Sequence, residues 1–538
     1  MKSSRESGAS DRESLSRRNF LAGLGRGAAL AALTPLPAWT RVVEGAAFAA
    51  AEKPNIVLLL ADDLGYGGLG IQGCPDIPTP NIDSIAKNGV RFTQGYVTCP
   101  ICAPTRAGLL TGRYQQRFGF ETNPGPEAGA ADNFGLPRSE PTLAERLKRL
   151  GYSTGMFGKW HLGYKADLQP TRRGFDEFLG FLSGAHSYLP GGRQNRGTSL
   201  LRGVEPVEER EYLTDALARE AVEFIDRRRG SPFFLYVPFN AVHAPLEAPE
   251  KYVDRFKGIQ EGTRRMHAAM LAALDDAAGR ILAKIRESGL EEQTLIIFLS
   301  DNGGPTAQTT SSNAPLRGEK GQVLEGGIRV PFMMQWKGRI APGRVDDRPV
   351  SSLDIHPTAL AAAGAAISPE WKLDGVDLLP FLAGKRSDSP HETLFWRMGR
   401  ARRAVRHREL KLVWPGSDQP ELYDLSSDPG EARDLAGKMP RDVARLRSLW
   451  DAWDRELMAP QWVMGEGQPA PGRRNAAAGV SPAGERQLRT RFDALDRNGD
   501  GVITADELRQ PQLFKRMDGN GDGKITFEEA RAFYRLRK

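Results

Sequence analysis

The sequence predicts an α/β protein with a large, mostly parallel central sheet flanked by helices, a smaller C-terminal antiparallel-sheet subdomain and an α-helical tail. Three features indicate this fold class. From about residue 54 to 365, short apolar runs alternate with helical patterns, which is typical of a parallel sheet covered on both faces. Candidate antiparallel strands such as Glu409–Trp414, then a helix through Trp450, follow between about 392 and 457. A motif repeated within 496–529 occupies the tail.

The first 49 residues have the features of an export signal. Ser16–Leu21 resembles the twin-arginine consensus, a weakly apolar run covers Leu21–Trp39, and Ala47–Ala49 offers a small-x-small cleavage site. Retention at a membrane is the alternative, but Arg26 and two prolines make the apolar run a poor spanning helix. We therefore expect export to the periplasm or the extracellular space by the twin-arginine route, without stable membrane insertion.

The central sheet is clearest at three apolar runs: Asn55–Ala61, Phe233–Phe239 and Thr294–Ser300. Apolar residues at helical spacing between Met266 and Ile285 predict a long helix with one face in the core. The chain becomes rich in Gly, Pro and Ala after Ala459, which predicts a linker. The expected parts are a signal peptide (1–49), a main α/β domain (50–385), a C-terminal subdomain (386–458), a linker (459–482) and the tail (483–538).

The composition is that of a soluble globular protein, with 40% hydrophobic and 26% charged residues. The formal net charge is +7, and residues 1–49 contribute seven basic and four acidic side chains, so a chain without them carries about +4. This mildly suits an anionic substrate. Because the basic residues are scattered rather than gathered in a stripe, we expect no nucleic-acid partner.

The tail contains two loops that match the EF-hand pattern, at 496–507 and 518–529. The predicted calcium ligands are Asp496, Asn498, Asp500, Val502, Thr504 and Glu507 in the first loop, and Asp518, Asn520, Asp522, Lys524, Thr526 and Glu529 in the second, with Val502 and Lys524 using their carbonyls. Acidic turns are the alternative, but two complete matches in tandem favour calcium. In an exported protein the ion is more often a structural staple than a signal.

Carboxylates follow two of the predicted strands. Asp62 and Asp63 come directly after the first strand, and Asp301 and Asn302 come after Thr294–Ser300. Sites in open α/β sheets form beyond the carboxyl ends of strands, and adjacent carboxylates repel unless a cation neutralises them. The set is all-oxygen and suits Ca²⁺ or Mg²⁺ better than Zn²⁺. Taken singly, each pair also reads as an ordinary turn.

Two of the seven histidines also follow apolar strands. His161 lies just after Tyr152–Phe157, next to Lys159, and His243 lies just after Phe233–Phe239. We expect both at the same sheet edge as the carboxylates. The remaining histidines are predicted to be structural or on the surface, with His186 a weak substrate-loop candidate: His186, His267, His356, His391 and His407.

Two of the three cysteines stand close together, at Cys99 and Cys102. Pro104 suits the first turn of a helix, which would place Cys102 at a helix N-terminus, where an anion is favoured, with Arg106 one turn on. One reading is a C-x-x-C redox pair. The other is that Cys102 is the precursor of a different nucleophile facing an oxyanion pocket.

The motifs together resemble those of the formylglycine-dependent (type I) sulfatases of the alkaline-phosphatase-like superfamily. The resemblance covers roughly Pro54–Leu457 and rests on C-x-P-x-R at Cys102–Arg106, L-T-G-R at Leu110–Arg113, the two carboxylate pairs, GKWHLG at Gly158–Gly163, His243 and the RGEKG box around Lys320. The chain departs from the usual pattern at Thr105, where serine is commoner, and at Glu319, where glycine is usual. Neither change removes a functional group.

The resemblance implies an alkaline-phosphatase-like sandwich and a sulfatase that hydrolyses sulfate monoesters. A formylglycine-generating enzyme would oxidise Cys102 to formylglycine, whose hydrate attacks sulfur. The metal, Ca²⁺ or Mg²⁺, would be held by Asp62, Asp63, Asp301, Asn302 and the residue at 102. Arg106, Lys159 and Lys320 would gather the sulfate oxygens, and Asp301 would help to activate the attacking hydroxyl. His243, assisted by Lys320, would protonate the leaving oxygen, and His161 would take the proton that drives release of sulfate.

The substrate's alcohol half is not encoded in these motifs. Basic residues in Ser183–Arg202 and near Arg397–Arg403 favour a sulfated oligo- or polysaccharide over a simple aryl sulfate. An aryl sulfatase without sugar specificity and a phosphate or phosphonate ester hydrolase of the same superfamily remain alternatives. In a third, non-enzymatic reading, the EF-hand tail is a calcium-dependent attachment module on an inert carrier.

Overall fold

The computed structural model describes residues 53–125, 133–191, 199–399, 401–462, 489, 492–493, 495–508 and 511–535. The predicted signal peptide and the linker from residue 463 onward lie outside the described residues. Within the part of the chain that is described, no helix is long and apolar enough to span a bilayer.

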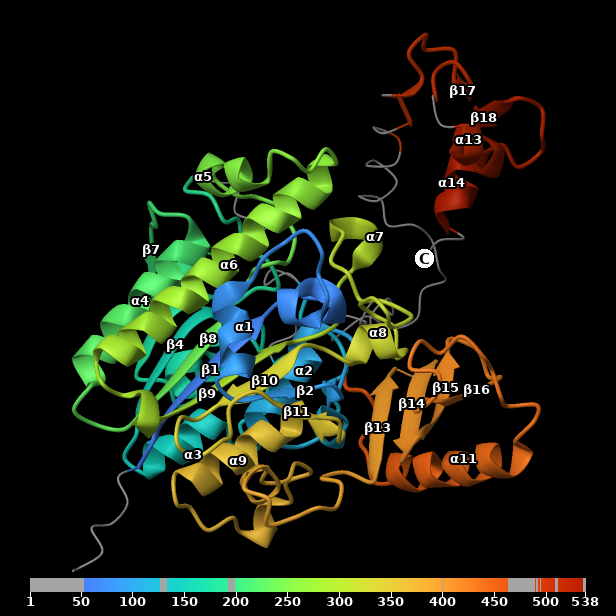
Figure 1. Cartoon of the computed structure of the whole chain (residues 1–538). Helices are drawn as coiled ribbons and strands as arrows, with labels where there is room; N and C mark the ends of the chain where they lie inside the picture. The colour runs from blue at the N-terminus through green and yellow to red at the C-terminus, as the bar shows by residue number, and fades with distance from the viewer. Residues whose placement is uncertain are drawn as a thin grey trace, which may run out of the picture. The chain divides into compact units, whose positions relative to one another are not determined.

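A ten-stranded mixed sheet forms the centre of the main domain (Figure 1). Its spatial order is β11 (Arg344–Asp346), β2 (Val90–Phe92), β10 (Phe332–Gln335), β9 (Thr294–Ser300), β1 (Asn55–Ala61), β8 (Phe233–Pro238), β4 (Ser153–Lys159), β5 (Glu177–Phe181), β6 (Leu200–Arg202) and β7 (Glu205–Val207). The five strands from β9 to β5 run parallel. The predicted class is therefore correct, and β1 and β9 have the predicted bounds.

Alternate residues of the central strands enter two different cores. In β1, Val57, Leu59 and Ala61 face one cluster, and the intervening residues face the other. The first face is covered by α1 (Pro80–Lys87), α4 (Leu213–Arg228) and α6 (Gly262–Glu287), and the second by α2 (Cys102–Thr111), α3 (Leu143–Arg149) and α9 (Ile355–Ala362) (Figure 1). Helix α6 is the helix predicted from the apolar spacing. Shorter helices are α5 (Glu250–Val253), α7 (Thr306–Thr309), α8 (Glu325–Ile328) and α10 (Leu379–Leu382).

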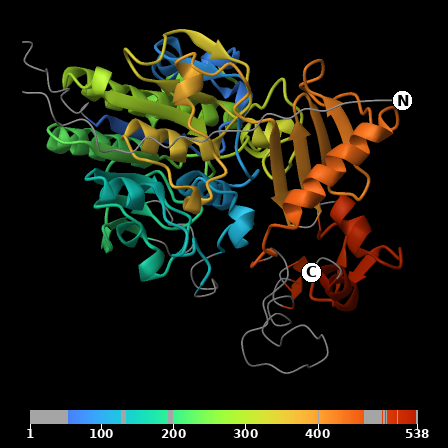
Figure 2. The same cartoon turned by 90° about the horizontal axis from the view of Figure 1, so that it is seen from below.

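The C-terminal subdomain is a four-stranded antiparallel sheet with one helix across it (Figure 2). Its elements are β13 (Thr393–Met398), β14 (Arg402–His407), β15 (Leu410–Pro415), β16 (Glu421–Asp424) and α11 (Pro440–Asp454). Leu446, Trp450 and Trp453 of α11 pack on one face. The opposite face contacts Tyr96, in the short pair of β3 (Gly95–Tyr96) with β12 (Val350–Ser351), and Ile328 of α8. This face therefore joins the subdomain to the main domain.

The chain after α11 differs from the predicted linker. Trp462 is buried and stacks on Phe134, with ring centroids 4.4 Å apart. The Gln461 backbone N–H donates to the Gly119 carbonyl at 2.9 Å. Residues 459–462 therefore pack on the main domain. The Gly- and Pro-rich composition predicted a linker because it gives no weight to a single aromatic residue, Trp462, that is buried in the core.

The tail contains β17 (Val502–Thr504) and β18 (Lys524–Thr526), paired antiparallel with Ile503 opposite Ile525. Helix α13 (Pro511–Met517) lies between the loops, where the spacing predicted a helix over Leu508–Met517, and α14 (Phe527–Arg535) begins at the end of the second loop. The buried cluster of the tail includes Ile503, Ile525 and Phe514.

Replacing Trp462 should destabilise the main domain. The W462A variant of the full chain should lose about 3 kcal/mol of unfolding free energy, because a buried indole leaves a cavity beside Phe134. Urea unfolding followed by circular dichroism measures the loss. The M458A variant is the control, since Met458 is 47% exposed. Equal stability of the two variants would mean that residues 459–462 behave as a linker.

Candidate active site

Four parallel strands end at one edge of the central sheet and bring the predicted polar residues together. The polar residues are Asp62 and Asp63 after β1, Asp301 and Asn302 after β9, Lys159 and His161 at the end of β4, and His243 after β8. Backbone hydrogen bonds interlock these ends: the Asp62 N–H donates to the Ala241 carbonyl at 2.9 Å, and the Asp301 N–H donates to the Ala61 carbonyl at 3.0 Å. The juxtaposition predicted from the sequence is therefore present.

Two site residues have left-handed backbones. Asp63 has φ 62° and His161 has φ 61°, a region that non-glycine residues adopt at a cost of about 1–3 kcal/mol. Both backbones are hydrogen-bonded: the Asp63 N–H donates to the Asp301 carboxylate, and the His161 N–H donates to the Leu182 carbonyl. The surrounding hydrogen bonds hold the strain, which is common at functional sites.

Cys102 is the first residue of α2 and is 1% exposed, with Pro104 in the first turn as predicted. Thr105 donates its hydroxyl to the Cys99 carbonyl at 2.7 Å, so this departure from the usual serine retains a hydroxyl hydrogen bond that fixes the loop. The Ala103 N–H donates to the Asn123 side-chain oxygen at 2.9 Å. No sequence motif indicated Asn123, which lies 20 residues away in an irregular segment.

Asp62 lies at the centre of one half of the site. Its carboxylate accepts from Lys159 at 2.5 Å and from Arg106 at 3.1 Å, and the Cys102 thiol lies 3.6 Å from its other oxygen. Arg106 also donates to Asp301 at 2.7 Å and to the Lys159 carbonyl at 3.1 Å. All three nitrogens of the fully buried guanidinium therefore bind protein oxygens. Arg106 organises the carboxylates, and the predicted contact with sulfate would require some of these bonds to be exchanged.

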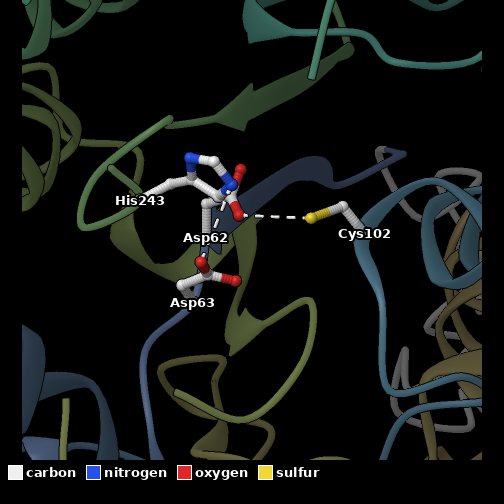
Figure 3. Close-up of side chains that lie close together, drawn as sticks. All are labelled: Asp62, Asp63, Cys102 and His243. Atoms are coloured by element: carbon white, nitrogen blue, oxygen red, sulfur yellow. Dashed lines mark hydrogen bonds and ion pairs between the residues drawn. The ribbon is translucent and has the colours of Figure 1, made fainter. Parts of the chain in front are cut away.

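Asp63 lies at the centre of the other half, and Figure 3 shows it beside His243. Lys320 lies 2.7 Å from one of its oxygens, Asn302 donates its side-chain N–H to the same oxygen at 2.7 Å, and His243 Nε2 lies 3.7 Å from the other. Glu319, beside Lys320, accepts from the Ala307 N–H at 3.3 Å at the rim of the site.

The six charged side chains balance in sign. The three carboxylates are Asp62, Asp63 and Asp301, and the three cations are Arg106, Lys159 and Lys320. Burial opposes ionisation of Asp62, but the positive charges of Lys159 and Arg106 outweigh it and hold the pKa of this carboxyl well below its usual value. Burial and the Asp62 charge raise the pKa of Asp301. Asp62 is thus the ionised centre of the cluster.

The two neighbouring cysteines are free thiols. Burial and the Asp62 charge raise the pKa of Cys102 to about 12, and burial raises the pKa of Cys99 further above its usual value. A redox-active C-x-x-C pair requires a lowered thiol pKa. The environment of Cys102 therefore opposes the redox reading, and it makes the unmodified thiol a poor nucleophile at neutral pH.

The residues present fit a hard divalent cation. Donor atoms of Asp62, Asp63, Cys102 and His243 all lie within 4.8 Å of one another (Figure 3). The side-chain oxygen of Asn302 is buried and has no hydrogen-bond partner in the described part of the chain, which leaves it available as a ligand. The predicted ligand set named Asp301 rather than His243; the Asp301 carboxylate borders this group and accepts from the Asp63 N–H at 3.3 Å.

The groups expected to move protons have different environments. Burial, with Lys159 and Arg106 nearby, lowers the pKa of His161, whose Nδ1 has no hydrogen-bond partner among the described residues. Burial also lowers the pKa of His243, against the opposing effect of Asp63. Burial would lower the pKa of Lys320, but the Asp63 carboxylate outweighs it and raises that pKa. Without a bound anion, both imidazoles are neutral and Lys320 is charged.

The other five histidines do not join the site cluster. His391 Nε2 lies 2.7 Å from Asp354, His356 Nδ1 lies 2.9 Å from the Leu110 carbonyl, His407 contacts Thr393, His267 is buried in α6, and His186 packs against Phe181. These contacts agree with the prediction that the five histidines are structural or lie on the surface. Burial lowers the pKa of His186, and its Nε2 has no partner among the described residues.

The predicted basic substrate segment near Arg397 needs correction. Arg397 is buried and forms ion pairs with Glu121 and Asp454, and Arg403 lies over the Trp414 ring. Arg397 therefore joins the C-terminal subdomain to the main domain through Glu121 and is not presented to a ligand, whereas the Arg403 side chain stays partly exposed. Of the other predicted segment, Ser183–Arg202, residues 192–198 lie outside the described residues.

Family models match three stretches of the chain. A sulfatase model matches residues 54–365, a model of the N-sulphoglucosamine sulphohydrolase C-terminal region matches 319–448, and an EF-hand model matches 488–510 and 512–534. The first alone covers more than half of the chain. The chain belongs to the sulfatase family. All of the strand-end residues, Cys102 and Lys320 fall within the matched sulfatase region, as the motifs predicted.

Relatives of this sulfatase are themselves named sulfatases. Arylsulfatase A of Homo sapiens is 36% identical over 462 residues, which cover 75% of this chain and 88% of that protein. N-acetylgalactosamine-6-sulfatase of Mus musculus is 34% identical over 409 residues, which cover 71% and 76%. The crystal structure of Ps i-CgsB superposes with a TM-score of 0.73 at 34% identity, over 76% of this chain and 95% of that one. Ps i-CgsB has also been solved in complex with k-i-k-neocarrahexaose. The predicted enzyme class is confirmed.

Proposed function

We propose that this sulfatase hydrolyses sulfate monoesters of carbohydrates, using a formylglycine derived from Cys102 and a divalent cation, Ca²⁺ or alternatively Mg²⁺. The observation that carries the proposal is the position of Cys102. Its side chain lies buried at a helix N-terminus, 3.6 Å from Asp62, inside a cluster of three carboxylates and three cations. No other described cysteine has such surroundings.

The charge balance supports a cation and a sulfate together. The cluster is neutral because three carboxylates match three cations. A divalent cation alone would add two positive charges to a buried site, and a sulfate alone would add negative charge to it. Both together add little net charge, so the carboxylates can turn to the cation while Lys159 and Lys320 turn to the sulfate oxygens. Asp62, Asp63, Asp301, Asn302 and the residue at 102 would hold the cation.

Conversion of Cys102 explains how a site that disfavours a thiolate can supply a nucleophile. The pKa of about 12 keeps the thiol protonated at neutral pH. A hydrated formylglycine supplies two hydroxyls, one to attack sulfur and one to lose a proton so that sulfate is released. The C-x-P-x-R element at Cys102–Arg106 is intact, and we propose a formylglycine-generating enzyme as the partner during maturation.

The remaining side chains have defined tasks in this proposal. Lys159 and Lys320 neutralise the sulfate oxygens, and Arg106 keeps Asp62 and Asp301 oriented. His243, beside Asp63 and near Lys320, gives a proton to the leaving oxygen. A bound sulfate raises the pKa of this imidazole by its negative charge, which opposes the lowering by burial. His161 is neutral, its Nδ1 has no partner among the residues that the structure describes, and it takes the proton from the hydroxyl at 102.

Two observations favour a sulfated saccharide as substrate. One relative is named N-acetylgalactosamine-6-sulfatase, and a structural relative at 34% identity has been solved with a neocarrahexaose. An aryl sulfatase without sugar specificity and a phosphate or phosphonate ester hydrolase are distinguished by comparing turnover of sulfated sugars, 4-nitrophenyl sulfate and 4-nitrophenyl phosphate. Faster turnover of the phosphate ester would overturn the assignment.

The two EF-hand loops are proposed to bind one Ca²⁺ each as structural staples. Their carboxylates already organise the loop backbone: Asp496 accepts from the Gly499 and Gly501 N–H groups, and Glu507 accepts from Thr504. Asp518 and Glu529 make the same contacts in the second loop. Backbone hydrogen bonds lower the pKa of Glu507 and Glu529, so both are ionised and suited to a cation.

Export by the twin-arginine route is proposed from residues 1–49. That route carries folded proteins, so Cys102 can be converted before the enzyme reaches the periplasm or the extracellular space. A mature chain beginning near Ala50 would retain every residue of the site.

Loss of the sulfur-bearing side chain should abolish turnover. We expect C102A to lower kcat/KM for sulfate esters by at least about 10⁴-fold, because the nucleophile is absent. The matched control, C74A, should stay within about twofold of wild type, since Cys74 lies outside the cluster. Mass spectrometry of active wild-type protein should show an aldehyde at position 102. Fully active protein with only an unmodified thiol there would contradict the proposal.

The role of His243 predicts a dependence on the leaving group. We expect H243A to slow hydrolysis of N-acetylgalactosamine 6-sulfate by about 10²–10⁴-fold, because a sugar alkoxide needs a proton to leave. The loss should be much smaller for 4-nitrophenyl sulfate, because nitrophenolate leaves unprotonated. Steady-state kcat values for both esters test this. An equal loss on both would exclude His243 as the proton donor.

Removing the EF-hand calcium ligands should leave catalysis intact. The E507Q/E529Q variant of the full chain should bind two fewer Ca²⁺ per chain, as measured by equilibrium dialysis and metal analysis. Its kcat/KM should stay within about twofold of wild type, because these ligands belong to a separate cluster with its own core. Loss of turnover in this variant would show that the tail is part of the catalytic machinery.

A further inference from the structure

Lys320 reaches the site from a loop that leads into the short helix α8. The Gly321 N–H donates to the Pro100 carbonyl at 2.8 Å, just before Cys102 in the chain. The Gly303 N–H, just after Asn302, donates to the Gly327 carbonyl of α8 at 3.0 Å. Helix α8 and its preceding loop therefore bridge the backbone on both sides of the site.

The packing around α8 leaves almost no free space. A Cβ added to Gly326 would lie 2.3 Å from the Gly318 carbonyl oxygen, and one added to Gly327 would lie 1.9 Å from the Gln322 carbonyl oxygen. The two glycines thus allow the helix and the Lys320 loop to touch backbone to backbone. Any shift of α8 is passed directly to the loop.

A buried charge cluster from the C-terminal subdomain holds α8 at its first residue. Lys411 of β15 lies 2.9 Å from one Glu325 oxygen, and Tyr96 donates its hydroxyl to the other at 2.7 Å. The Glu325 backbone N–H donates to Glu431 at 2.7 Å, and Lys411 also lies 2.8 Å from Glu431. The side chains of Glu325, Lys411 and Glu431 are all fully buried.

The charges in this cluster depend on one another. Burial opposes ionisation of Glu325, but Lys411 and the arginines nearby lower its pKa to about 2, so it is ionised. Removing Lys411 would leave a buried carboxylate without its partner, which favours water entry and displacement of α8.

We propose that Lys411 and Glu431 are positioning residues for the reaction. They hold Glu325 and α8, and through the glycine contacts they set the place of the Lys320 ammonium beside Asp63. This inference rests on the proposed role of Lys320 in binding the sulfate and assisting its leaving group. The C-terminal subdomain thereby contributes to catalysis without contacting the substrate.

A double-mutant cycle in the full-length, matured enzyme tests the coupling. Wild type, K411M, K320A and K320A/K411M are compared by kcat/KM for 4-nitrophenyl sulfate. We expect K411M to lower kcat/KM at least tenfold in the wild-type background and less than twofold in the K320A background, because Lys320 is then no longer there to be placed. Equal losses in the two backgrounds, or no loss in K411M, would overturn the inference.

The same cycle separates the inference from the proposed function. Full activity of K320A would refute the role of Lys320, and absence of turnover by wild type would refute the sulfatase proposal itself. If K320A lowers kcat/KM and K411M lowers it by the same factor in both backgrounds, only the positioning role is refuted.

A second variant and a stability control complete the experiment. E431Q keeps an oxygen for the Glu325 N–H but weakens the attraction for Lys411, and we expect about a threefold loss that also disappears in K320A. If K411M does not fold, E431Q takes its place in the double-mutant cycle. L446A removes a fully buried side chain from α11 in the same subdomain. It should lower the unfolding temperature and leave kcat/KM within twofold of wild type; a loss of turnover matching that of K411M would mean that subdomain stability alone is measured.

Discussion

The close packing of three carboxylates with three cations at one sheet edge is the constraint on which the rest of this structure depends. Asp62 lies 2.5 Å from Lys159 and 3.1 Å from Arg106, and all three side chains are fully buried. Isolated charges could not remain ionised at such depth. Their mutual neutralisation keeps them charged beside Cys102. In the proposed function, these partners are exchanged for a cation and a sulfate.

The fold is organised so that this edge stays rigid. The strands β9, β1, β8 and β4 run parallel with both faces buried, and their carboxyl ends are tied together by backbone hydrogen bonds such as that from Asp301 to Ala61. Cys102, the first residue of helix α2, lies at the same edge, 3.6 Å from Asp62. The C-terminal subdomain supports this edge through α8, which explains why a sheet that carries no predicted catalytic group packs so closely on the main domain.

Much of the candidate site could be predicted from the sequence, because its signals are local. A strand such as Asn55–Ala61 is a continuous apolar run, so the residues that follow it can be assigned to the sheet edge. The motif around Cys102 and the two EF-hand loops are short patterns whose spacing reflects their geometry. Asn123, Glu325 and Lys411 could not be found in this way. Each acts through partners from distant parts of the chain, and no local pattern marks them.

The sequence by itself determined which groups are available: the cysteine at 102, the oxygen-bearing side chains after two strands, and the continuous apolar runs that predict a parallel sheet. Tertiary structure decided which charges pair. It turned Arg106 towards Asp62 and Asp301, took Arg397 out of contact with substrate by pairing it with Glu121, and placed Trp462 in the core instead of a linker. The physical reason is that the energy of a buried charge or ring depends on its neighbours in space. Those neighbours are defined only when the chain has folded.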